Sequence, residues 1–93
     1  MPGLWVVSYS SIADKALYDA YSAAAVKALI PFKGEVKCFG PPKSVPEGES
    51  CHVVIVEFES LEVAHAAYAS EAYAAAMALA AGAFQRTFAI CSA

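Results

Sequence analysis

The sequence carries little positive charge, and that charge is scattered. One arginine, Arg86, and five lysines stand against nine acidic residues, for a net charge of −3. A nucleic-acid-binding surface needs clustered basic side chains to neutralise phosphates. Because the sequence has no such cluster, we expect no nucleic-acid partner.

Long apolar runs and recognisable cofactor motifs are also missing. The alanine-rich stretch 72–83 is well short of the ~20 residues that a membrane-spanning helix needs. The first residues show no charged segment followed by an apolar one, so we expect no signal peptide. The sequence has no Gly-x-Gly-x-x-Gly, phosphate-binding loop, Gly-x-Ser-x-Gly or His-Glu-x-x-His motif. We therefore expect a cytoplasmic protein without a membrane contact or a cofactor.

Metal-binding residues are sparse. The three cysteines, Cys38, Cys51 and Cys91, have no Cys-x-x-Cys pairing and fall on three different predicted strands. A zinc site needs Cys and His ligands close together, and the two histidines have no matching carboxylate cluster. We expect no metal site, and three reduced thiols that serve as small core residues.

Apolar residues, in contrast, are abundant. They make up 59% of 93 residues, and the mean hydropathy is +0.51. The length predicts one domain, residues 1–93. A composition this apolar is unusual for a small monomer. A partner subunit is the simplest way to cover the apolar surface that one chain leaves exposed.

The order of predicted elements indicates an α+β fold. Aromatic and β-branched segments predict strands at 4–9, 35–39, 51–58 and 86–91. Helical spacing predicts one helix from the cap Asp14 to Pro31, and another from the cap Ser60, interrupted near Ala69 by a second cap, Ser70. This βαββαβ order is typical of the ferredoxin-like fold, a four-stranded antiparallel sheet with two helices on one face.

Each predicted helix presents an apolar stripe that should face the sheet. The predicted inward residues are Leu17, Tyr21, Ala24 and Ala28 in the first helix, Leu61, Ala64 and Tyr68 in the second, and Tyr73, Met77, Ala80 and Phe84 after the interruption.

The strand 51–58 predicts a dimer. A one-sided antiparallel sheet should alternate apolar and polar residues. Here both faces are largely apolar, and the helices can cover only one of them. Exposing Val53 and Ile55 would forfeit ~1.5–3 kcal/mol each. We therefore expect a homodimer through the open sheet face.

Several of these features together resemble one protein family. They are Tyr18-x-x-Tyr21 after Asp14, Lys33-Gly34, Glu47-Gly48, Val-Ile-Val-Glu-Phe-Glu-Ser at 54–60, Ala64, Tyr68, Ser70 and Tyr73. The chain resembles the domain of unknown function 1330 family over essentially its whole length. The resemblance implies a dimeric α/β barrel, in which two ferredoxin-like sheets face each other.

Two positions depart from the pattern of that family, and the superfamily suggests several chemistries. His65 stands where relatives often have arginine, and the end reads Cys91-Ser92-Ala93 where relatives often close in Glu-Gly. The superfamily includes cofactor-independent monooxygenases, muconolactone isomerases, dye-decolorising enzymes and haem degraders. The chain has no asparagine, and its one tryptophan, Trp5, is in the first strand, which argues against haem degradation.

Two residues are candidates for catalysis. Glu57 is a lone carboxylate inside an apolar strand, where burial would raise its pKa towards that of a general base. Equally, Glu57 could form a structural ion pair or hydrogen bond with Arg86, a lysine or a tyrosine, and we favour that role. His52 could act as a base or be a half-solvated residue at the start of its strand.

Aromatic residues on the helices are candidates for a ligand pocket. Tyr21, Tyr68 and Tyr73, with His65 nearby, could line an apolar pocket with a few polar groups. Core packing is the alternative for the tyrosines, and a surface position for His65. We expect a small homodimeric protein that is either a cofactor-independent enzyme acting on a small organic acid or quinone-like compound, or a non-catalytic ligand-binding or structural dimer.

Overall fold

Four strands form a single antiparallel sheet. The computed structural model describes residues 1–93. The strands lie in the order β2-β3-β1-β4. Their bounds are β1 (Gly3–Ile12), β2 (Glu35–Gly40), β3 (His52–Phe58) and β4 (Phe84–Ser92).

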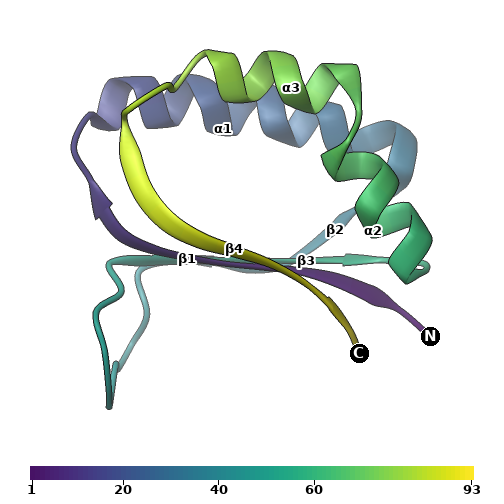
Figure 1. Ribbon diagram of the computed structural model, residues 1–93. Coiled ribbons are helices and arrows are strands. Elements are labelled where there is room, and N and C mark those ends of the chain that lie inside the picture. The colour runs from purple at the N-terminus through teal and green to yellow at the C-terminus, as the bar shows by residue number, and fades with distance from the viewer.

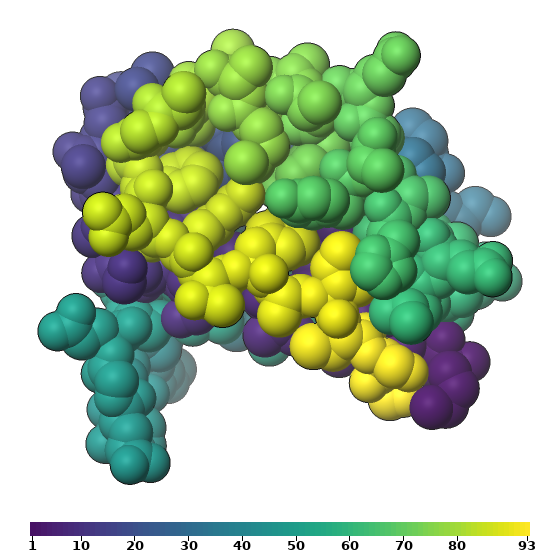
Figure 2. Space-filling view, viewed as in Figure 1, coloured from purple at the N-terminus to yellow at the C-terminus, as the bar shows by residue number.

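All helices cover the same face of this sheet (Figure 1). They are α1 (Lys15–Leu29), the 3-10 turn η1 (Ile30–Phe32), α2 (Leu61–Tyr68) and α3 (Glu71–Ala78). The arrangement confirms the predicted ferredoxin-like fold. Figure 1 also shows the loop between β2 and β3 projecting away from the helices, and Figure 2 shows it standing clear of the main body.

The helices begin at the predicted caps. Side-chain oxygens of Asp14, Ser60 and Ser70 each accept a hydrogen bond from the backbone N–H three residues later, at 3.0–3.2 Å. Each bond satisfies one of the free amides that a helix start leaves without a partner. The cap at Ser70 therefore divides the predicted second helix into α2 and α3.

The strand register sorts side chains into two sets of rows across the sheet, because successive residues point to opposite faces. The helix-facing rows are Val36–Val56–Trp5–Ile90, Phe39–Val54–Val7–Phe88 and His52–Tyr9–Arg86. The open-face rows are Cys38–Ile55–Val6–Ala89 and Glu35–Glu57–Leu4–Cys91. The open face is thus apolar along one complete row.

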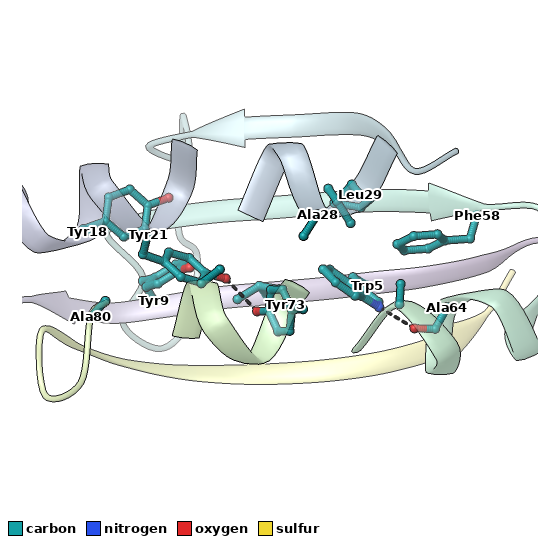
Figure 3. Close-up of a cluster of buried hydrophobic side chains, with 14 of the residues drawn as sticks. Trp5, Tyr9, Tyr18, Tyr21, Ala28, Leu29, Phe58, Ala64, Tyr73 and Ala80 are labelled. Atoms are coloured by element: carbon teal, nitrogen blue, oxygen red, sulfur yellow. Dashed lines mark hydrogen bonds between the residues drawn. The ribbon is translucent and has the colours of Figure 1, made fainter. Parts of the chain in front are cut away.

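Trp5 is the centre of the core between the two layers. Its ring lies 5.0 Å from those of Phe58, Tyr73 and Phe88, centroid to centroid. Its indole N–H donates to the backbone oxygen of Ala64 at 2.9 Å (Figure 3). The tryptophan therefore joins β1, β3, β4 and both α2 and α3.

Some residues that the helical spacing predicted to face the sheet are exposed instead. Leu17 is 39% exposed, whereas its neighbour Tyr18 is 6% exposed and packs on the sheet. Leu61 and Tyr68 are also exposed, and Ala67 is buried between them. Alanines follow both possible stripes, so apolar spacing alone did not define the buried face.

Two further expectations are corrected. Phe84 begins β4 instead of ending the preceding helix. Cys38 and Cys51 are exposed rather than core residues, and only Cys91 is partly covered. None of the helices combines the length and the apolar character that crossing a bilayer requires.

Gly3 is required by the close approach of β1 to the start of α2. A Cβ at this position would lie 2.5 Å from the backbone oxygen of Ser60 and 2.7 Å from the Cα of Leu61. Since both are backbone atoms, Gly3→Ala should destabilise the fold by about 1–3 kcal/mol in urea unfolding. Ser11→Ala, on an exposed part of the same strand, should stay within about 0.5 kcal/mol. Equal stability of both variants would contradict the close approach.

Candidate functional site

One row across the sheet carries most of the polar groups on the helix side. His52 of β3, Tyr9 of β1 and Arg86 of β4 lie side by side in the strand register. The helices place three more tyrosines over this row, Tyr18 and Tyr21 from α1 and Tyr73 from α3 (Figure 3). We call these six residues the tyrosine–arginine cluster.

Arg86 is the hub of the cluster. One terminal nitrogen donates to the hydroxyls of Tyr9 at 2.9 Å and Tyr21 at 3.0 Å. The other donates to the hydroxyl of Tyr73 at 3.2 Å and to Sδ of Met77 at 2.9 Å. The Tyr21 and Tyr73 hydroxyls are 2.6 Å apart (Figure 3). Arg86 thus cross-links the sheet to both α1 and α3.

Aromatic rings surround the charge of Arg86 as well. Its guanidinium carbon lies 4.8–5.5 Å from the ring centres of Tyr9, Tyr21, Phe84 and Phe88. Such contacts stabilise a cation through the negative faces of the rings, by about 0.5–2 kcal/mol each depending on desolvation.

No carboxylate balances this cation. The ion pairs of the chain join Lys15 to Asp19 and Lys37 to Glu35 and Glu57, and none includes Arg86. Burial raises the pKa of Tyr9 and Tyr73, so both phenols stay neutral. Burial would lower the pKa of Arg86, but the hydroxyls around it raise that pKa above the usual value, so the guanidinium stays charged.

A second polar pair lies at the other end of the row. The Tyr18 hydroxyl is 2.7 Å from Nε2 of His52, and the tautomer decides which of them donates. Burial lowers the pKa of His52 and raises that of Tyr18, so the neutral forms of both are favoured. A neutral imidazole beside a neutral phenol can pass a proton to or from a bound molecule.

Two neighbouring hollows lie between α1 and the sheet. The inner cavity, about 40 Å³, is lined by apolar and aromatic side chains, with Ser22 and Arg86 the other lining residues. The outer groove, about 550 Å³, includes His52, Lys15 and Asp19. Both hollows share Tyr18, Ser22, Val26 and Phe39 as walls.

The structure brings together some of the residues singled out in the sequence and separates others. His52, Tyr21 and Tyr73 all belong to the tyrosine–arginine cluster. Tyr68 packs against Trp5 and Phe88 but is 44% exposed and lines neither hollow. His65 is exposed on α2 and lines neither hollow.

Glu57 lies on the open face, away from His52. Its carboxylate is 3.7 Å from the ammonium of Lys37, and its strand neighbours in that row are Glu35 and Leu4. Lysine, arginine and tyrosine were the partners expected for Glu57, and Lys37 is the one that it contacts. Arg86 lies on the opposite face of the sheet. A base role for Glu57 would have to act from the open face.

Sequence reasoning missed Arg86 as a site residue, together with Tyr9. The signal was present in the alternation Phe84-x-Arg86-x-Phe88-x-Ile90, where the single arginine occupies an inward position between aromatic residues. The strand alternation, which separates two faces in 51–58, also places Arg86 on the buried face of the last strand. No three His, Cys, Asp or Glu side chains gather as a metal-ligand set.

Comparison with known protein families shows which family the chain belongs to. The family described as domain of unknown function (DUF1330) matches residues 2–93. The chain belongs to this family. No match is found among the curated proteins.

Several solved structures of low sequence identity share the fold. A protein of unknown function from Rhodopseudomonas palustris has a TM-score of 0.81 at 15% identity, covering 99% of this chain and 82% of that one. A dimeric ferredoxin-like protein of unknown function from Jannaschia has a TM-score of 0.73 at 11% identity, covering 100% of both chains. A candidate antibiotic biosynthesis monooxygenase from Nitrosomonas europaea has a TM-score of 0.69 at 11% identity, covering 99% and 89%. At sequence identities this low, the structural similarity shows a shared fold alone.

His52 should titrate below the usual histidine pKa of about 6.5, because burial disfavours its charged form. In the unfolded chain His52 binds its proton more readily, so this residue costs stability as the pH falls from about 6.5 through its folded pKa. An NMR titration of the imidazole in a His65→Gln background should give this lower midpoint. His52→Gln should remove that part of the pH dependence of unfolding, and a midpoint at or above 6.5 would contradict the burial argument.

Proposed function

We propose that this DUF1330 protein is a homodimer that binds a small organic molecule in the two hollows between α1 and the sheet. The observation that carries the proposal is the inner cavity, an apolar aromatic space with Arg86 and Ser22 in its walls, beside a groove that includes the Tyr18–His52 pair. Small-molecule sites commonly combine apolar walls with a few placed polar groups. Cavity and groove together suit a ligand of about one ring, such as a small organic acid or quinone-like compound.

The homodimer is proposed through the open sheet face. The row Cys38–Ile55–Val6–Ala89 and the neighbouring Leu4 are apolar and at most partly buried, and no helix covers this face of the sheet (Figure 1). A second copy of the same face is the simplest cover, since it presents the same apolar row about a two-fold axis. The loop between β2 and β3 projects on this side of the sheet (Figure 1), where it would flank the second copy. The Jannaschia neighbour, which is described as dimeric, supports a homodimer.

Glu57 fits the dimer better than a reaction. It lies in the open-face row beside Lys37, opposite Glu35 across the strand pair. Two like charges directly opposite each other are unfavourable, and Lys37 lies between them as a counter-charge. We therefore propose Glu57 as an interface residue that sets the register of the two sheets.

A catalytic role on the same ligand is the second candidate, and the Tyr18–His52 contact favours it. His52 would act as a general base at the groove, with Tyr18 holding its imidazole in place. A cofactor-independent oxidation or isomerisation of a small acid or quinone-like compound needs a proton transfer of this kind. The likeness in fold to the candidate monooxygenase supports this class without naming a substrate.

Val6→Glu should convert the protein from dimer to monomer in light scattering at micromolar concentration. Val6 lies within the apolar open-face row, and a carboxylate there would have to be buried without a partner. Ala74→Glu, on the exposed side of α3, should remain dimeric. Glu57→Gln should weaken the dimer if Glu57 sets the register. A monomeric wild type would overturn the proposed interface.

Ligands of the proposed class should raise the melting temperature in a thermal-shift screen of small aromatic acids, phenols, quinones and haem. Binding to the folded state at about 100 times Kd adds about 2.7 kcal/mol. For a chain of this size that is a rise of roughly 10 °C or more.

A matched pair of α1 variants locates the binding site. Ala25→Leu fills the inner cavity and should abolish the shift, whereas Ala20→Leu, exposed on the same helix, should keep it. A shift that survives Ala25→Leu would place the ligand elsewhere.

A further inference from the structure

We infer that the ligand of this pocket is a carboxylate on a single-ring compound, and that Arg86 is the residue that binds its anionic group. The inference rests on the proposed function, and it names the chemical class that the pocket selects. Charge balance, the supply of hydrogen-bond acceptors and the dimensions of the two hollows each support it.

Charge balance comes first. Arg86 is held among phenols, a thioether and aromatic rings, and the chain offers it no acidic partner. Removing a cation from water is costly unless an opposite charge compensates for it. The helix-facing rows and the inner cavity contain no Asp or Glu. A bound anion would therefore supply the counter-charge that the folded chain lacks.

Hydrogen-bond supply points the same way. The arginine side chain has hydrogen-bond donors and no acceptor. Each tyrosine hydroxyl has one donor proton and an oxygen that can accept. Tyr21 and Tyr73 both accept from Arg86, and one of them also donates to the other. The second phenol proton of that pair has no acceptor among these residues. A carboxylate has acceptor oxygens and no donor, so it fits a cluster in which donors exceed acceptors.

The dimensions of the hollows set the rest of the ligand. The inner cavity of about 40 Å³ has room for a carboxylate-sized group, and the outer groove of about 550 Å³ has room for a larger body. Arg86 and His52 sit two strands apart, roughly 10 Å between backbones. The Tyr9 ring lies between them, 5.4 Å from the His52 ring and 5.5 Å from the Arg86 guanidinium. A ligand that meets both groups would therefore lie along the walls that the two hollows share, and we assign to it a body of one substituted ring. The Tyr18–His52 pair then meets a hydroxyl or carbonyl at the far end of the ring.

The experiment compares 4-hydroxybenzoate with its neutral isostere 4-hydroxybenzamide by calorimetric titration. The wild type should bind the acid at least about tenfold more tightly than the amide, because a charge-assisted hydrogen bond is stronger than a neutral one. Arg86→Met should remove this preference and keep the affinity for the amide. Lys27→Met makes the same change in net charge on an exposed part of α1 outside both hollows, and should keep the preference.

A second variant covers the case in which Arg86→Met does not fold. Tyr73→Phe keeps the guanidinium and removes a hydroxyl that accepts from it, so more donors are left for an anion and the preference for the acid should be at least that of the wild type. An acid preference that persists in Arg86→Met, or equal binding of acid and amide by the wild type, overturns the anion inference and leaves the proposed ligand site intact. If neither compound nor any member of the thermal-shift screen binds, the proposed function fails as well.

Discussion

A full positive charge in the layer between helices and sheet is the constraint that organises this molecule. Arg86 projects from an edge strand into aromatic surroundings, where a guanidinium needs hydrogen-bond acceptors. Those acceptors are hydroxyls of Tyr9, Tyr21 and Tyr73, which come from a different strand and from two helices. Holding one cation thus cross-links α1 and α3 to β1 and β4, and it leaves an aromatic space with a guanidinium and no carboxylate in its walls.

The two faces of the sheet divide the work of the protein. The helix-facing rows lie under the tyrosine–arginine cluster and the two hollows, where we propose the ligand site. The open face carries an apolar row flanked by Lys37, Glu35 and Glu57, which suits contact with a second copy. Because alternate residues of a strand point to opposite faces, β3 places His52 on the side of the proposed ligand site and Glu57 on the side of the proposed interface. A change in strand register would disrupt both together.

The structure also explains why an alanine-rich chain can hold a well-defined core. Alanines let α2 approach the sheet closely and let α1 and α3 approach each other, and Ala64, Ala67 and Ala76 are at most 1% exposed. The aromatic side chains of the strands then fill the space between the layers, with Trp5 in contact with four other rings. Small residues on the helices and large ones on the sheet interlock, which gives a packed interior from few large helical side chains.

The sequence by itself determined the ferredoxin-like order of elements, the three helix caps and the family, since caps, strand alternation and breakers act over a few neighbouring residues. It could not choose between Leu17 and Tyr18 for the buried side of α1, because alanines follow both stripes. It could not show that Arg86 is the hub of the site. His52, Tyr9 and Arg86 are separated by more than thirty positions along the chain, and only the register of three paired strands puts them in one row. Placing Glu57 and His52 on opposite faces of one strand followed from the alternation. What each face meets was decided by helix packing, a long-range contact that local sequence does not encode.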